Sequence, residues 1–279
     1  MAGRLNPQAP LPIYWALRMT KRRLRADGTP SPRGRRTPKP PPTKEQLAEL
    51  ERLTGELPEP LRAFRDRGLL NPVRRFRLEE AIRHRTRTLV PVLHGVHDPH
   101  NQAAVMRSCE ALGLQEFHFI RSESGRPLHA SSRVTQNAHR WIDVVEHGDF
   151  VAAQRALQNR GIALHAASFN ENAVPLQEMD FARPIAILFG NESKGLPEEI
   201  IDACDGTFVI PLFGLSQSLN ISVAAAVSLS WAVDSRRRAW GDPGDLTPDE
   251  QMELRHRFYE TALRGSLQDD LPHPPGSAE

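Results

Sequence analysis

Two segments in the last third of the chain constrain its fold more than any other feature. The first reads Ile185-Ala-Ile-Leu-Phe-Gly-Asn-Glu-Ser-Lys-Gly-Leu196, and the second reads Phe208-Val-Ile-Pro-Leu-Phe-Gly-Leu-Ser-Gln-Ser-Leu-Asn220. Each begins with an apolar run that suits one buried strand and ends at a glycine-bearing polar loop. We expect a helix after each loop, one beginning at Pro197 and one running from Ser218, its expected cap, to Trp231. Such units place both loops at the carboxyl edge of a parallel sheet, where open α/β folds bind ligands.

Strand and helix patterns alternate through the middle of the chain as well. We expect strands at residues 89–96, 116–121, 141–145 and 162–167, and helices at 101–113 and 149–159. With the two units above, this gives about six strands interleaved with helices, a pattern typical of an α/β fold whose mostly parallel sheet is covered on both faces.

Composition divides the 279 residues into three parts. Residues 1–70 form a basic, proline-rich N-terminal extension with some helix, and its first 43 residues are too polar to fold alone, so it should be partly disordered. Residues 71–240 form the main domain. Residues 241–279 form a C-terminal helix, opened by Thr247 and reaching about Leu263, and a tail.

Positive charge is concentrated before Pro40, although the net charge of the chain is only +2. Ten Lys and Arg residues stand there against one acid, Asp27. This N-terminal arm therefore has a formal net charge of +9, and the rest of the chain has a net charge of −7. Such an arm suggests a polyanionic partner, or equally a solvated tail. A predicted helix over residues 72–87 carries a second group of positive charges on one face. This face could contact phosphates or be an exposed helix surface. Its members are Arg74, Arg75, Arg77, Arg83, Arg85 and Arg87.

Several functional classes lack their sequence patterns. The strand at residue 89 is followed by His94-Gly-Val-His-Asp-Pro-His100, which is neither a dinucleotide-binding fingerprint nor a P-loop. The histidines there are not on one helix face and have no acidic partner pattern, so we expect no metal. Two cysteines, Cys109 and Cys204, indicate a reducing, cytoplasmic location, and no apolar run is long enough for a membrane span.

Three motifs, taken in order, resemble those of a known enzyme family. They are Asn101-x-x-Ala-x-x-Arg107, Phe189-Gly-Asn-Glu-Ser-Lys-Gly-Leu196, and Ile210-Pro-Leu-Phe-Gly-Leu-Ser-Gln-Ser-Leu-Asn220-Ile-Ser-Val-Ala-Ala. Together they resemble the SpoU branch of the SPOUT RNA methyltransferases, in particular the TrmH-type tRNA guanosine 2'-O-methyltransferases. The resemblance covers residues 73–264. It implies an α/β domain with a deep trefoil knot, S-adenosylmethionine bound in the knot, a homodimer and an RNA substrate, with tRNA favoured.

The resemblance also implies roles for particular residues. The catalytic set would be Arg107, Asn101, Glu192, Ser218 and Asn220. The family treats the arginine as a general base, but a guanidinium stays protonated, so we favour Arg107 as an electrostatic clamp on hydroxyl and phosphate. Asn101 would orient Arg107, Ser218 and Asn220 would hold the substrate and the third-motif loop, and Glu192 would fix the second-motif loop or be purely structural.

Two further sets of residues are expected, the first from the same resemblance and the second chiefly from the charge pattern. The cofactor would be lined by Leu188, Gly190, Ile210, Leu212 and Leu219, because adenine needs apolar walls and backbone donors and acceptors. The RNA would be bound by arginines near the two ends of the main domain: Arg74, Arg75, Arg83, Arg236, Arg237 and Arg238.

The second motif departs from the family in one respect. Its usual Gly-Ala/Gln-Glu-Lys is replaced by Gly190-Asn-Glu-Ser-Lys194, which moves the lysine by one place. This departure and the N-terminal extension leave the RNA open. The alternatives are an rRNA 2'-O-methyltransferase and a knotted RNA-binding protein that acts as a chaperone without turnover.

Overall fold

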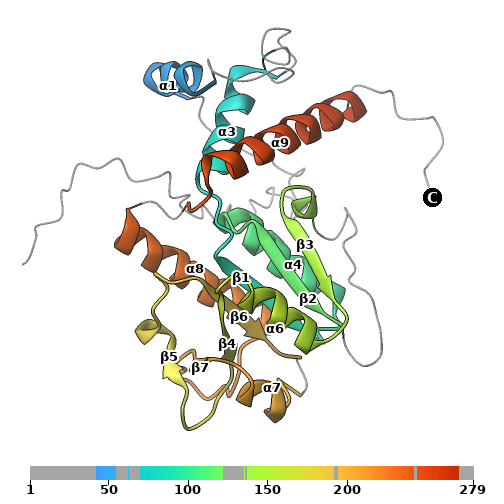
Figure 1. The fold of residues 1–279 in the computed structure, drawn as a ribbon, viewed down its shortest axis with the longest axis vertical. Coiled ribbons are helices and arrows are strands. Elements are labelled where there is room, and N and C mark those ends of the chain that lie inside the picture. Colours follow the sequence, from blue (N-terminus) through green and yellow to red (C-terminus); the bar gives the residue numbers. More distant parts are fainter. Residues whose placement is uncertain are drawn as a thin grey trace, which may run out of the picture. The chain divides into compact units, whose positions relative to one another are not determined.

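A parallel sheet of seven strands forms the centre of the described chain (Figure 1). The computed structural model describes residues 42–54, 62, 70–121, 135, 137–191, 194–241 and 244–269. In sequence order the strands are β1 (Leu89–His94), β2 (Glu116–Ile120), β3 (Asp143–His147), β4 (Ala163–Ala167), β5 (Val174–Pro175), β6 (Ile185–Phe189) and β7 (Gly206–Val209). Their spatial order is β3-β2-β1-β6-β4-β7-β5, and every pairing is parallel.

This arrangement confirms the expected α/β class and the parallel sheet. Strand β5 was not expected, because two residues are too short to give a periodic pattern. The helices are α1 (Lys44–Thr54), α3 (Pro72–Arg83), α4 (Pro99–Leu112), α6 (Phe150–Gln158), α7 (Glu198–Asp202), α8 (Ile221–Trp240) and α9 (Pro248–Asp269), with 3-10 turns η1 (Ala138–Arg140) and η2 (Leu176–Glu178). The basic arm, residues 1–41, lies outside the described residues.

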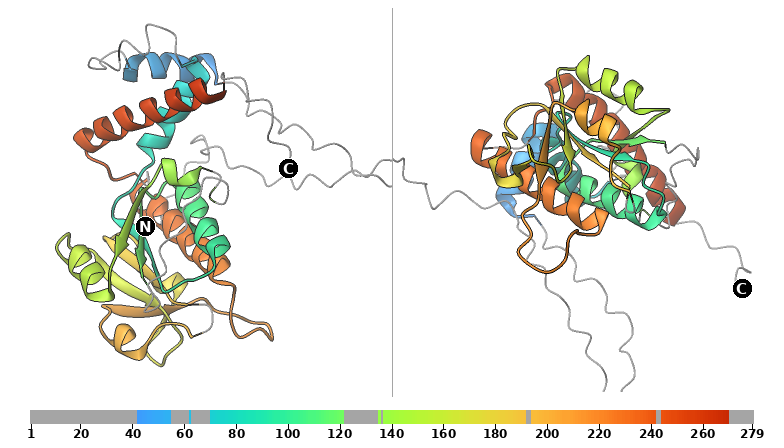
Figure 2. Two further views of the ribbon diagram at one scale, coloured as in Figure 1. Left: turned by 90° about the vertical axis from the view of Figure 1, so that its right-hand side faces the viewer. Right: turned by 90° about the horizontal axis from the view of Figure 1, so that it is seen from below.

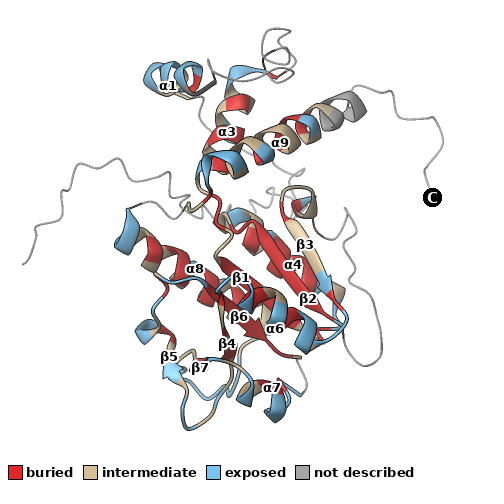
Figure 3. Cartoon of the chain, viewed as in Figure 1, coloured by how far each residue is buried: buried red, intermediate tan, exposed pale blue. Residues whose placement is uncertain are grey.

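Helices cover both faces of the sheet, as the buried strands require. Along β1, Leu89 and Leu93 point into one apolar cluster and Val90 and Val92 into another, as expected for side chains that alternate across a strand. The first cluster lies under α4 and α8, and the second lies under α6 and α7. Figure 2 shows α4 and α8 together on one side, with α6 on the other. The central strands β1 and β6 and the neighbouring β2 are accordingly buried over nearly their whole length, whereas β3 and β5 at the sheet edges are not (Figure 3).

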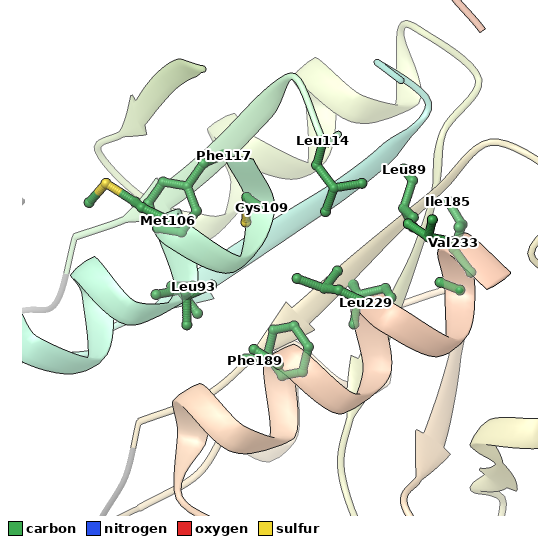
Figure 4. Packing of buried hydrophobic residues seen from close by; sticks show 14 of the residues in the cluster. Leu89, Leu93, Met106, Cys109, Leu114, Phe117, Ile185, Phe189, Leu229 and Val233 are labelled. Carbon is green, nitrogen blue, oxygen red and sulfur yellow. The ribbon is translucent and has the colours of Figure 1, made fainter. Parts of the chain in front are cut away.

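The cluster under α4 and α8 joins segments that are far apart in sequence. Figure 4 shows Leu229 and Val233 of α8 beside Leu89, Ile185 and the other labelled side chains of the sheet and α4. All of these side chains are buried. Burying a side chain of this size contributes about 1.5–3 kcal/mol, so this contact holds α8 against the sheet.

Two helix boundaries differ from the sequence-based expectation. The helix expected from Asn101 begins at Pro99, with Asp98 as its cap, because the Asp98 carboxylate accepts a hydrogen bond of 2.9 Å from the His100 N–H. The helix expected from Ser218 to Trp231 is α8. It begins three residues later, behind the cap Asn220, and continues to Trp240. Ser218 and Leu219 remain in the preceding loop.

The helices α3 and α9 share a small apolar core of their own. Helix α3 packs against α9, and α1 packs against α3. The Glu79 carboxylate accepts hydrogen bonds from the Tyr259 hydroxyl (3.0 Å) and Arg255 Nε (2.9 Å). Part of the predicted main domain, residues 72–83, therefore contacts the C-terminal helix. The buried members of this core are Leu70, Leu78, Ile82, Leu246, Leu254, Phe258, Tyr259 and Ala262.

A buried arginine, Arg236, joins the end of α8 to the beginnings of β1 and β6. Its side chain is 0% exposed and donates hydrogen bonds to three backbone carbonyls and two threonine hydroxyls: Phe181 O (2.7 Å), Arg183 O (2.9 Å), Thr88 O (2.9 Å), Thr86 Oγ1 (2.9 Å) and Thr88 Oγ1 (2.9 Å). Asp245 completes the cluster at 3.4 Å and accepts from both threonine hydroxyls. Burial lowers the pKa of Arg236 to about 10, so it is still a cation at neutral pH.

We predict that Arg236→Met lowers the free energy of unfolding by about 3–5 kcal/mol, because it leaves Asp245 and three carbonyls without their cation. Chemical denaturation followed by circular dichroism measures the change. The matched control is Arg238→Met two positions later, where the side chain is 68% exposed and pairs with Asp234 on the same helix. An exposed pair contributes less than about 1 kcal/mol, so equal losses in the two variants would contradict the prediction.

Candidate functional site

The loop after β6 is closed by two backbone hydrogen bonds and depends on two glycines. We call residues 190–196 the Gly190 loop; residues 192 and 193 of it lie outside the described residues. The Asn191 N–H donates to the Gly195 carbonyl (3.0 Å), and the Gly195 N–H donates to the Asn191 carbonyl (2.9 Å). A Cβ at Gly190 would lie 2.4 Å from the carbonyl carbon of Gly195, and Gly195 has a φ of +68°. Gly190 leaves no room for a side chain, and the left-handed backbone at Gly195 strongly favours glycine.

The Gly190 loop is attached to the end of β1 through Asn191. Its side-chain amide donates a 2.8 Å hydrogen bond to the carbonyl of Gly95, just after that strand. Its side-chain oxygen accepts a longer bond of 3.3 Å from the Lys194 N–H. One side chain therefore fixes the position of the loop at the carboxyl edge of the sheet.

The loop after β7, residues 210–220, has a different character, and we call it the Ser218 loop. From residue 211 to residue 219, the backbone makes no backbone–backbone hydrogen bond with the part of the chain that the structure describes. Phe213 is 97% exposed, and Leu215 is fully exposed. Unpaired backbone groups beside exposed apolar side chains are what a ligand or a partner chain would cover.

Asn220 joins the third motif to the first. Its side-chain oxygen accepts from the Ser222 N–H (2.9 Å), which caps α8, and its amide donates to the side-chain oxygen of Asn101 (3.2 Å). Asn101 lies in the first turn of α4 and is buried. The start of α4 and the start of α8 are thus held together beside the Ser218 loop.

Arg107 lies farther along α4, where its side chain is exposed. It forms one wall of a cavity of about 590 Å³. Among the described residues, its guanidinium has no hydrogen bond or ion pair. An arginine with all five donors available is suited to bind an anionic or hydroxyl group of a ligand.

The remaining residues of the predicted catalytic and cofactor sets lie on or near the two loops. Ser218 is exposed in the Ser218 loop, and Glu192 lies outside the described residues. The Leu188 side chain is fully buried in the cluster under α6 and α7, so only its backbone is available to a ligand. Leu212 is exposed, and Ile210 and Leu219 are half-buried.

The predicted RNA-binding arginines divide into two groups. Arg236 is enclosed by its own hydrogen bonds, and Arg75 is 6% exposed and pairs with Glu51 at 2.9 Å. Buried guanidiniums cannot contact a phosphate backbone, so the structure corrects the prediction for these two. Arg83 and Arg238 are exposed, and Arg74 and Arg237 are half-buried. The expected phosphate-contacting face over residues 72–87 is reduced further, because Arg85 is buried and Arg87 pairs with Glu116 and Asp143.

Neither a metal site nor a membrane-spanning helix is found in the described part of the chain. No group of three His, Cys, Asp or Glu side chains there is arranged to hold a metal ion. Of the described helices, none has the length and apolar character of a membrane span.

A protein-family model matches the part of the chain that contains these loops. The model described as the SpoU rRNA Methylase family matches residues 88–230, just over half of the chain. The match includes Asn101, Arg107, both loops and the start of α8. The chain belongs to the SpoU methylase family. This confirms the sequence-based identification of an RNA ribose methyltransferase of the SpoU type.

Curated relatives agree with the family model. The chain is 39% identical over 166 residues to the tRNA (guanosine(18)-2'-O)-methyltransferase of Thermus thermophilus, a match that covers 60% of this chain and 84% of that protein. It is 34% identical over 209 residues to the enzyme of the same name from Escherichia coli, covering 74% and 90%.

A solved structure supports the fold of this SpoU methylase. The chain is similar to the TrmH/SpoU tRNA modifying enzyme of A. aeolicus, with a TM-score of 0.59 and 27% identity, covering 70% of this chain and 96% of the other. The individual roles of the site residues stay predictions.

Sequence reasoning missed three residues of the site. Asn191 was overlooked as the link to Gly95, although an asparagine in a loop between two glycines is a signal for such a contact. Glu110 and Trp141, which line the cavity beside Arg107, come from segments 31 residues apart. No local pattern connects them.

Proposed function

We propose that this SpoU methylase uses S-adenosylmethionine to methylate the ribose 2'-hydroxyl of a guanosine in tRNA. The observation that carries the proposal is the joining of the first and third motifs: Asn220 bonds Asn101, and Arg107 lies on the same helix as Asn101 with its guanidinium available. The names of the curated relatives favour tRNA and guanosine over rRNA.

The two loops fit S-adenosylmethionine. The close approach of Gly190 to Gly195 leaves a backbone surface without side chains, and the Ser218 loop offers unpaired backbone donors and acceptors beside apolar side chains. Gly190, Ile210, Leu212 and Leu219 would hold the cofactor, together with the backbone of Leu188. When bound, the cofactor supplies an electrophilic methyl group on a sulfonium.

Arg107 is proposed to position and stabilise the attacking hydroxyl. A ribose hydroxyl is a weak nucleophile, so correct alignment can lower the activation free energy by about 7 kcal/mol or more in favourable cases. The Arg107 guanidinium would hold the hydroxyl oxygen and a neighbouring phosphate with its two parallel N–H groups, which stabilises negative charge as the proton leaves. The phosphate or a water molecule takes the proton, since the guanidinium is already protonated.

We expect Arg107→Lys to bind S-adenosylmethionine normally and to lose at least about 100-fold in kcat. Lysine keeps the charge but lacks the planar pair of donors, and removing one such donor costs about that factor. Calorimetry measures cofactor binding, and single-turnover assays measure the methyl-transfer step. The control is Arg155→Lys on the opposite face of the sheet. A turnover close to that of the unaltered enzyme would contradict the clamp.

The substrate can be tested directly. Purified protein is incubated with labelled S-adenosylmethionine and separate tRNA and rRNA fractions, and the methylated ribose is then mapped. We expect label in tRNA at a guanosine. Label in rRNA would favour the rRNA alternative, and RNA binding without any label would favour the chaperone alternative.

A homodimer and a trefoil knot are part of the proposal. On α8, Val223 and Val227 are exposed one turn apart, and an exposed apolar stripe of this kind suits a second copy of the chain.

For the knot, the support is topological: β7 pairs with β4 and β5, yet the next helix, α8, packs on α4 and β1. The intervening loop therefore returns across the sheet. A crystal structure that traces residues 185–240 will decide the knot.

We predict that Val227→Glu shifts the protein from dimer to monomer, because it places a charge in the proposed apolar interface. Light scattering measures the molar mass. The matched control is Val151→Glu, at a valine of α6 that is also exposed, 57% against 41% for Val227. Dimers in both variants would argue against an α8 interface, and monomeric unaltered protein would rule out the dimer.

The basic arm and the exposed Arg83 and Arg238 are proposed to contact RNA phosphates, together with Arg74 and Arg237. Affinity from such contacts falls steeply with salt, so comparing full-length protein with a variant lacking residues 1–41 over a salt series would detect a role for the arm. The cytoplasmic location expected from the sequence stays a prediction.

A further inference from the structure

The cavity beside Arg107 has the size and the lining of a binding site. Its volume of about 590 Å³ falls within the range of about 300–1,000 Å³ that is usual for small-molecule pockets. Helix α4 forms one side, and the segment around η1 forms the other. The lining residues that bear on its function are Arg107, Glu110 and Trp141.

Glu110 presents a fixed acceptor to this cavity. One carboxylate oxygen, Oε1, accepts from Nη2 of Arg85 at 3.3 Å. Arg85 is itself buried, donates to the carbonyl of Leu114 (3.2 Å) and lies over the ring of Phe258 (5.3 Å). Among the described residues, the other oxygen of Glu110 has no hydrogen bond. The pairing holds the carboxylate in place and leaves it able to accept donors from a ligand.

Trp141 gives the cavity a flat apolar surface. Its ring packs edge-on against Phe258, with centroids 5.2 Å apart and planes at 81°. A ring held in this way is rigid, and aromatic side chains of this kind stack on unpaired bases with about 1–3 kcal/mol per base.

The order of residues along α4 suits one nucleotide. A helix rises about 1.5 Å per residue, so Arg107 lies about 9 Å from Asn101 and Glu110 about 4.5 Å beyond Arg107. The cofactor loops lie at the Asn101 end. A ribose at Arg107 would therefore have the methyl donor on one side and room for its base on the other, toward Glu110.

We propose that this cavity receives the base of the methylated nucleotide, and that Glu110 selects guanine. The inference rests on the proposed function. Guanine is the only common base that presents two adjacent donors, N1–H and the 2-amino group, and a carboxylate can accept both. Adenine offers an acceptor at N1, and cytosine and uracil each offer at most one donor beside an acceptor. The base would leave its stack to enter, as in other enzymes that act on a single nucleotide.

The test compares two tRNAs that differ only at the target, guanosine or inosine, assembled by ligation. Inosine keeps N1–H but lacks the 2-amino group. For unaltered protein we expect kcat/KM to be at least about tenfold lower with inosine, since a well-formed paired contact gives about 1–3 kcal/mol of discrimination. In Glu110→Gln we expect guanosine activity to fall by a similar factor and the guanosine-to-inosine ratio to approach one.

Two controls separate base selection from structure. Arg85→Lys keeps both the carboxylate and a cation beside it, so it should retain the ratio of unaltered protein even if it lowers stability. Calorimetry with S-adenosylmethionine should give the same affinity for Glu110→Gln as for unaltered protein.

The outcomes are distinct. An unaltered protein that methylates neither tRNA disproves the proposed function. An unaltered protein that methylates guanosine and inosine equally overturns the base-selection proposal, even if Glu110→Gln fails to fold. An unchanged ratio in a folded Glu110→Gln protein overturns it too.

Discussion

The placement of α8 depends on a polar contact at each of its ends. At its C-terminal end, Arg236 is buried among carbonyls of the segments that lead into β1 and β6, with Asp245 as its counter-ion. At its N-terminal end, Asn220 caps the helix and bonds Asn101 of α4. A buried cation is costly unless it is fully paired, so the Arg236 cluster tolerates few alternative positions. The apolar contacts of Leu229 and Val233 then fill the space between these two points.

This anchoring explains how a site can be made largely from backbone. The Ser218 loop has few hydrogen bonds of its own, but its two ends are fixed by β7 and by the Asn220 cap. The Gly190 loop is fixed in turn by Asn191 and by its own closure. The two loops follow β6 and β7, which are separated by β4 alone, so both lie at the carboxyl edge of one parallel sheet. Arg107 adds the charged group that backbone cannot supply.

Two arginines of the arginine-rich segments have a structural role that the sequence did not predict. Arg85 and Arg236 have a sequence context that suggests an RNA surface, but both are buried. They bind carbonyls and carboxylates at the junction of the sheet with the C-terminal helix. Arg87 pairs with Glu116 and Asp143 in the same region. Buried arginines in this family member therefore have a structural role, and the proposed RNA contacts are left to the exposed ones, so burial rather than residue type separates the two groups.

The sequence by itself determined the features that depend on neighbouring residues. The alternation of apolar runs predicted the parallel sheet, and Thr247 caps the C-terminal helix that it was expected to open. Gly113 ends α4 in the left-handed conformation. The ordered motifs were enough to identify the family. Only the tertiary structure decided which arginines are buried, that Asn191 reaches Gly95, and that Glu110 and Trp141 share a cavity with Arg107. These facts depend on contacts between segments distant in the chain, and periodicity and capping report only on residues within a few positions of one another.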